Sequence, residues 1–109
     1  MQTIILYVTV TSISEAERLG KVAIENRLAA CVNILGRSTS IYRWEGAVTV
    51  GDEVVMIFKT TENLRVALTK KIKSMHSYAC PCIAVLPIHG GNNEFLEWIH
   101  NETSNTVVD

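Results

Sequence analysis

The sequence predicts an α+β domain, a ferredoxin-like β-α-β-β-α-β sandwich with a short C-terminal helix. Apolar runs rich in β-branched residues occur near residues 3–11, 52–60 and 81–88, and apolar residues recur at helical spacing over residues 14–30 and 61–75. An extended segment lies between the first helix and the second apolar run. This order matches the split β-α-β arrangement, in which helices cover one face of a single sheet.

The first strand and the first helix are predicted from local residue types. The stretch "TIILYVTVT", residues 3–11, is β-branched and aromatic, which favours a strand. A helix is expected over residues 14–30. Ser14, with Glu17 three positions later, forms a capping box that satisfies free amides at the helix start.

The middle of the chain predicts a long arm and a second helix. "CVNILG" and "STSIYRWEG" are extended, Gly46 or Gly51 supplies a turn, and residues 52–60 return as a strand. The second helix is expected over residues 61–75, with Thr60 or Thr61 as its cap. One face of this helix is apolar and consists of Leu64, Leu68, Ile72 and Met75.

The last strand is expected to begin at Pro81, where a missing amide is tolerated. A short helix in "NNEFLEWIHNE" follows the glycine pair at 90–91. The length predicts one domain over residues 1–109. The tail from about residue 103 is expected to be disordered.

The strands are more apolar than a solvent-facing sheet requires. "IILYV", "VVMIF" and "IAVL" are continuous apolar runs, whereas a sheet with one wet face alternates apolar and polar residues. The alternative is that a few exposed apolar residues are tolerated. We expect instead that a second copy of the chain covers the other face. The arm from Val32 to Trp44 should reach that neighbour and protect open strand edges.

Composition excludes several classes of partner. The 109 residues carry a net charge of only −1, so no strong field attracts nucleic acid or an anionic membrane. The short basic cluster Lys70, Lys71 and Lys73 is interpreted as a solvated helix face. The N-terminus lacks a basic start and a cleavage site. Three cysteines do not form a disulfide framework, which favours a reducing, cytoplasmic location.

The stretch "MHSYACPC", residues 75–82, gathers the sulfur and imidazole donors that soft and borderline metal ions prefer. His76 and Met75 at the end of the second helix could hold a copper ion, since a helix C-terminus favours a cation. The alternative is that His76 contacts only carbonyl groups of its own helix. His89 and His100 are isolated and are expected at surface or structural positions.

Cys80 and Cys82 flank Pro81. Residues i and i+2 of an extended strand point to the same side, so both thiols could face one metal ion. However, a structural zinc site takes four ligands in other spacings, and a disulfide here would close a small, strained ring. The favoured interpretation is that Cys82 is a small buried apolar residue.

A ligand cleft is a separate hypothesis. Lys59 ends the buried strand "VVMIF", and beside Tyr42, Trp44 and Tyr78 it could line a cleft for an anionic ligand. The alternative is an ordinary strand-end charge that reaches water.

Nothing local marks a catalytic site. Cys31 could form a nucleophilic set with a histidine and an acid. The sequence has no G-x-S-x-G, no phosphate-binding glycine loop and no H-E-x-x-H. We therefore predict a protein that is not an enzyme and has no catalytic residues.

Four blocks in the same order resemble the CutA family of divalent-cation tolerance proteins: "RLAACVNI", "SIYRWEG", "EVVMIFKTT" and the H-x-Y…P-x-I…LPI…G…FLEWI block. The resemblance spans about residues 3–101. It implies a ferredoxin-like subunit in a compact homotrimer, similar to the PII-type signalling trimers, and a link to copper and other divalent metals.

The resemblance also implies site positions. Family members usually have H-P-Y-E or H-P-Y-Q where this chain has His76-Ser77-Tyr78-Ala79. The copper site proposed in a bacterial relative maps onto Val8, Met75 and His76. Of these, His76 keeps its donor, and Met75 offers sulfur in place of nitrogen. Cys80 and Cys82 match no family ligand.

Three functional hypotheses follow. The first is a trimeric metal-response protein that weakly binds copper or another divalent cation, without catalysis and with no required cofactor. The second is a PII-like regulatory trimer that binds a small anion between subunits. The third is an enzyme that uses a cleft lysine or tyrosine. None of them has nucleic acid or a membrane as partner.

Overall fold

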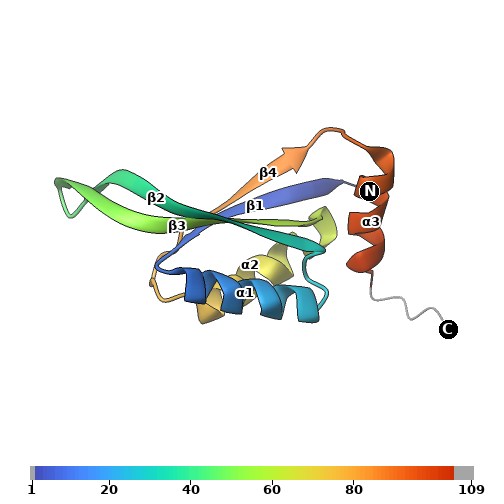
Figure 1. Ribbon diagram of the computed structural model, residues 1–109, viewed down its shortest axis with the longest axis horizontal. Helices are drawn as coiled ribbons and strands as arrows, with labels where there is room; N and C mark the ends of the chain where they lie inside the picture. The colour runs from blue at the N-terminus through green and yellow to red at the C-terminus, as the bar shows by residue number, and fades with distance from the viewer. Residues whose placement is uncertain (1, 105–109) are drawn as a thin grey trace.

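The computed structural model describes residues 2–104. Its elements follow the predicted order (Figure 1): β1 (Thr3–Val10), α1 (Ile13–Glu25), β2 (Cys31–Trp44), β3 (Ala47–Thr61), a 3-10 turn (Glu62–Leu64), α2 (Arg65–Met75), β4 (Ile83–Ile88) and α3 (Asn93–Glu102). The four strands form one antiparallel sheet in the order β2-β3-β1-β4. The predicted fold class is therefore confirmed.

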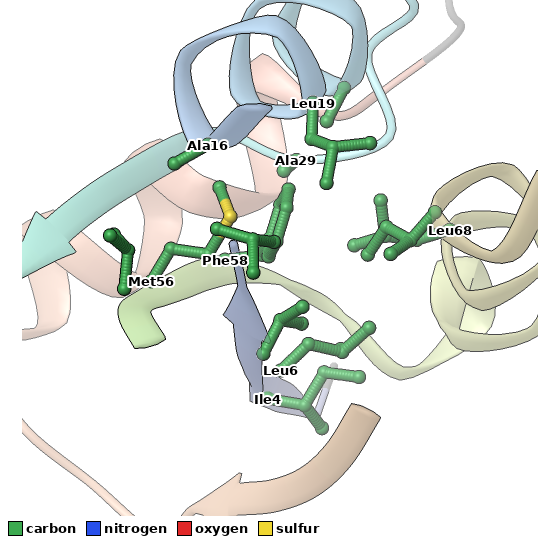
Figure 2. Packing of buried hydrophobic residues seen from close by; sticks show 13 residues of the cluster. Ile4, Leu6, Ala16, Leu19, Ala29, Met56, Phe58 and Leu68 are labelled. Atoms are coloured by element: carbon green, nitrogen blue, oxygen red, sulfur yellow. The ribbon is translucent and has the colours of Figure 1, made fainter. Parts of the chain in front are cut away.

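The core lies between the sheet and the pair α1 and α2, which cover the same face (Figure 1). Alternate residues of β1 and β3 point toward the helices, as the period of two in a strand requires. In the close view, Leu6, Met56 and Phe58 lie with Leu19 and Leu68 in one cluster (Figure 2). Of the predicted apolar face of the second helix, Leu68 and Ile72 are buried, and Leu64 and Met75 are half-buried.

Strands β2 and β3 form a hairpin that projects well beyond α1 and α2 (Figure 1). The loop residues Glu45 and Gly46 have φ of 49° and 80°, the positive values typical of a tight type I′ hairpin turn. Gly46 therefore supplies the predicted turn. Near the body, Leu35 is an additional residue opposite the Met56–Val55 step, which forms a β-bulge.

Helix α1 begins two residues earlier than the capping box predicted. Its N-cap is Ser12, whose hydroxyl oxygen accepts from the Glu15 N–H at 3.0 Å, so the Ser14–Glu17 assignment is wrong. The helix ends at Glu25 rather than at residue 30, because Arg27 adopts φ 55°. A residue in this left-handed conformation stops the helix.

The other helix and strand boundaries also differ from prediction. Thr61 precedes the 3-10 turn and makes no side-chain cap, and α2 itself begins at Arg65. The Thr60 hydroxyl instead donates to the Leu28 carbonyl at 2.7 Å. Strand β4 begins at Ile83, two residues after Pro81, which cannot donate to a neighbouring strand.

Helix α3 stands at one end of the sheet, apart from α1 and α2 (Figure 1). It begins after the glycine pair, as predicted, and Asn92 caps it by accepting from the Glu94 N–H. The Arg27 side chain donates to the Glu102 carbonyl at 3.0 Å and ties the ends of α1 and α3 together. Most of the tail predicted to be disordered lies outside the described residues.

Candidate functional site

His76 lies where α2 ends, and both of its ring nitrogens have partners. Its Nδ1 lies 3.0 Å from the Tyr78 backbone nitrogen, and its Nε2 lies 2.8 Å from the Thr9 carbonyl oxygen. A backbone N–H can only donate and a carbonyl can only accept. We therefore assign the imidazole proton to Nε2, which leaves Nδ1 as the acceptor.

The Thr9 carbonyl is available because β1 extends further than β4. The last β1–β4 pair is Val8 with Ile83, so Thr9 lies one residue past the ladder. The His76 imidazole, at the end of α2, bonds to the Thr9 carbonyl, for which β4 supplies no partner. The contact joins residues 67 positions apart in sequence and fixes the ring orientation.

Met75 does not point freely into solvent. It is half-buried and packs against the hydrophobic core. Its thioether therefore has a packing role in one chain.

A buried carboxylate holds the segment that follows His76. Glu15 is 6% exposed. Its Oε2 accepts from the Ser77 N–H at 2.8 Å, and its Oε1 accepts from the Ser77 hydroxyl at 3.1 Å. The Thr11 N–H and hydroxyl also donate to Oε1, at 2.9 and 2.8 Å. Burial alone raises the pKa of Glu15, but these hydrogen bonds from Thr11 and Ser77 outweigh it and lower the pKa to about 2.

Tyr78 lies beside His76, with ring centroids 5.1 Å apart. Burial raises the pKa of Tyr78, and the Glu53 carboxylate, the Tyr42 phenol and Glu15 raise it further. The structure thus brings Tyr78 near Tyr42 and Glu53 of the hairpin. The phenol stays protonated and can donate a hydrogen bond.

Lys59 lies at the other end of the sheet. Its Nζ is 5.5 Å from the ring centroid of Phe95 on α3, a cation–π contact. Tyr42 pairs with Thr49, ten residues before Lys59 on β3. This is about 33 Å along an extended strand. One chain therefore does not bring Lys59 together with Tyr42.

The hairpin register nevertheless places these residues on one face. Tyr42 and Trp44 oppose Thr49 and Ala47. Both of these β3 residues are an even number of positions from Lys59, so their side chains lie on the same face of the sheet as that of Lys59. The bulge at Leu35 sets this face for β2, because one additional residue exchanges the two faces of the strand. Both aromatic side chains are exposed.

The sequence did not single out Glu15 or Phe95, and it identified Ser77 only as a departure from the family motif. The pair Ser12 and Glu15, which has the same capping-box spacing two residues before the predicted pair, could have identified Glu15 from the sequence. One groove of the described residues, about 360 Å³, lies between α1 and β2 and contains none of the six predicted site residues; its lining is Glu17, Gly20, Lys21, Ile24, Glu25, Val32 and Ile34.

Residues 2–104 contain no group of three or more histidine, cysteine or acidic side chains placed to hold a metal ion. His89 and His100 are exposed, as predicted. Cys82 is also exposed, so the prediction that it is buried is wrong. The reason is that β4 begins only at the next residue, Ile83.

Residues 4–102 match the model of the CutA1 divalent ion tolerance protein family. The divalent-cation tolerance protein CutA of Thermus thermophilus is 42% identical and covers 94% of this chain and 99% of its own length. The chloroplastic protein CutA 1 of rice is 45% identical over 93% of this chain. This chain spans only 57% of the rice protein.

Solved structures give the same result. The crystal structure of CutA1 from Oryza sativa has a TM-score of 0.93 at 42% identity and covers 97% of each chain. The periplasmic divalent cation tolerance protein CutA from Archaeoglobus fulgidus has a TM-score of 0.91 at 40% identity, covering 94% of this chain and 99% of its own.

The relatives differ in location, since one is named periplasmic and another chloroplastic. Their names describe cation tolerance rather than a reaction. No helix within residues 2–104 is long and apolar enough to span a membrane. The match over nearly every described element, at about 40% identity, shows that this chain belongs to the CutA1 divalent ion tolerance family.

Proposed function

We propose that this chain acts in divalent-cation tolerance as a cytoplasmic homotrimer that binds copper or another divalent cation weakly. It acts without catalysis and requires no cofactor. The match of residues 4–102 to the family of that name carries this proposal. Neither nucleic acid nor a membrane is a partner, in keeping with a net charge of −1.

The proposed metal ligand is His76, with Met75 as a neighbouring sulfur donor. The contacts of His76 support weak binding, because the unprotonated nitrogen Nδ1 already accepts from the Tyr78 N–H, which a metal ion must displace. Nε2 carries the proton that faces the Thr9 carbonyl. Breaking such a hydrogen bond costs about 1 kcal/mol. Met75 must also leave its place against the core.

Calorimetric titration with Cu(II) tests the metal site. His76→Ala should abolish the weak binding, whereas His100→Ala, which changes an exposed histidine on α3, should keep it. Binding should weaken on acidification, since a protonated imidazole cannot coordinate. Unchanged affinity in His76→Ala would contradict the site. A Met75→Leu variant measures the sulfur contribution at nearly constant volume.

Assembly is supported by the apolar surface that one chain leaves uncovered. The far side of the sheet, opposite α1 and α2, carries the exposed Leu86 and the half-buried Ile5 and Tyr7. On the hairpin, Ile41 and Val50 oppose each other and are 71% and 65% exposed. An isolated two-stranded hairpin is at best marginally stable in water. Neighbouring copies would cover both surfaces.

A second candidate is a PII-like regulatory trimer that binds a small anion between subunits. The proposed cleft contains Lys59 from one copy and the hairpin residues Tyr42 and Trp44, with Tyr78, from the next. Because about 33 Å separates Lys59 from Tyr42 within one chain, such a cleft requires two copies. Lys59 supplies the positive charge for an anion.

Thermal unfolding with and without citrate, ATP or inorganic phosphate tests this candidate. A ligand that binds only the folded assembly raises the unfolding temperature. The increase should disappear in Lys59→Ala and persist in Lys71→Ala, which removes an exposed lysine of α2. Loss of the effect in both variants would indicate nonspecific charge binding and reject the cleft.

A further inference from the structure

The pair Cys80 and Cys82 is not explained by packing. Both thiols are free and exposed, and both lie outside α2 and β4, in the segment that joins them. Free cysteines that serve the core behave as small buried apolar residues. Two exposed thiols one residue apart therefore need another explanation.

Chain geometry lets both thiols reach one small ion. Two residues of extended chain span at most about 7 Å, so the Cα atoms of Cys80 and Cys82 are no further apart than that. Pro81 fixes its own φ and restricts Cys80 to extended conformations. The segment is thus short and conformationally restricted. A disulfide would close a strained ring, which favours a shared ligand over a direct bond.

The number of available thiolate donors, two, indicates which metal ion the pair can bind. Thiolates prefer soft ions such as Cu(I) and Zn²⁺. A structural zinc site needs four ligands, and no group of three or more histidine, cysteine or acidic side chains occurs within residues 2–104. Cu(I) is stable with two thiolates in a nearly linear arrangement. We propose that Cys80 and Cys82 form a two-coordinate Cu(I) site.

Binding at this site is an exchange of protons for metal. Each thiol loses its proton to solvent, each sulfur forms one bond to Cu(I), and the oxidation state of copper does not change. The ion must therefore arrive as Cu(I), under reducing conditions. This site goes beyond the proposed divalent-cation function, because its ion is monovalent and its ligands do not include His76.

Competition with a coloured chelator tests the proposal. The full, reduced chain is titrated against the Cu(I)–bicinchoninate complex, and loss of its absorbance measures the copper transferred. We expect one Cu(I) per chain. Cys80→Ser and Cys82→Ser should each weaken binding at least 100-fold, because either change removes one arm of the chelate.

Cys31→Ser is the matched control, since Cys31 is a free thiol on β2, and it should bind Cu(I) as the parent does. His76→Ala should also bind normally, which separates this site from the divalent site. Circular dichroism verifies that each variant is folded. No transfer to the parent chain, one copper per two chains, or an equal loss in Cys31→Ser would overturn the proposal.

Discussion

Ser77 gives the candidate site a feature that the usual family motif lacks. Where that motif has proline, the Ser77 N–H and hydroxyl both donate to Glu15. Proline has no N–H to donate. The segment carrying His76 and Tyr78 is therefore tied to the first turn of α1 by a charged acceptor, and hydrogen bonds to charged groups are the stronger kind.

Glu15 should make stability depend on acid pH. Its pKa is about 2 in the folded chain against 4.5 for an ordinary glutamate. The depressed value stabilises the fold above pH 4.5, by roughly 3 kcal/mol, and this contribution is lost as the pH falls toward 2. Urea unfolding at fixed protein concentration should show that Glu15→Gln loses most of this acid dependence.

Glu17→Gln is the control for that experiment, because Glu17 lies on the same helix but is exposed. It should keep the acid dependence of the parent. Equal behaviour of the two variants would contradict the role of Glu15.

Comparing alanine with proline at position 77 distinguishes the contributions of the two Ser77 donors, the hydroxyl and the backbone N–H, to stability. Ser77→Ala removes the hydroxyl contact alone and should cost about 1 kcal/mol, whereas Ser77→Pro also removes the N–H contact and should cost about 1–2 kcal/mol more. The comparison is made by denaturant unfolding at pH 7. Equal stability of the two variants would show that the N–H bond contributes nothing.

Among the elements, the hairpin β2–β3 is the one that projects beyond the helices (Figure 1). Its turn places a glutamate at φ 49°, a conformation that costs a residue with a Cβ about 1 kcal/mol. Gly46 at φ 80° occupies the second positive-φ position without that cost.

Glu45→Gly should therefore stabilise the protein by about 0.5–1 kcal/mol, and Gly46→Ala should destabilise it by a similar amount. Nothing lies within 4 Å of a Cβ built at Gly46, so the second change tests backbone conformation rather than crowding. Thermal unfolding measures both. Destabilisation by Glu45→Gly, or stabilisation by Gly46→Ala, would contradict the turn assignment.

At the scale of the whole molecule, substitutions on the two faces of β3 distinguish folding of one chain from assembly of several copies. Met56 points toward the helices and is fully buried, so a charge there should unfold the chain directly. Ile57 points to the opposite face and is half-buried in one chain. A charge at Ile57 therefore tests the proposed contact between copies.

Ile57→Lys should convert the assembly into smaller species or unfolded chain, whereas Val66→Lys on the outer side of α2 should leave it intact. Light scattering should give the parent a mass of about 36 kDa, three times the 12.1 kDa of one chain. A folded parent monomer at micromolar concentration would contradict the proposal.

The sequence by itself determined the order of elements, the long extended arm with a turn at Gly46 or Gly51, and the apolar face of α2. These features follow from residue types and from spacing between near neighbours, which local conformational preference and the hydrophobic effect fix directly. The family blocks were likewise readable in order along the chain.

Only the tertiary structure decided how the candidate site is assembled. Glu15 meets Ser77 across 62 residues, and His76 meets Thr9 across 67. The bulge at Leu35 sets which face Tyr42 presents, and the end of β1–β4 pairing at Ile83 leaves Cys82 exposed. These outcomes depend on strand register and on contacts between distant segments, and residue types along the chain do not specify which distant groups will meet.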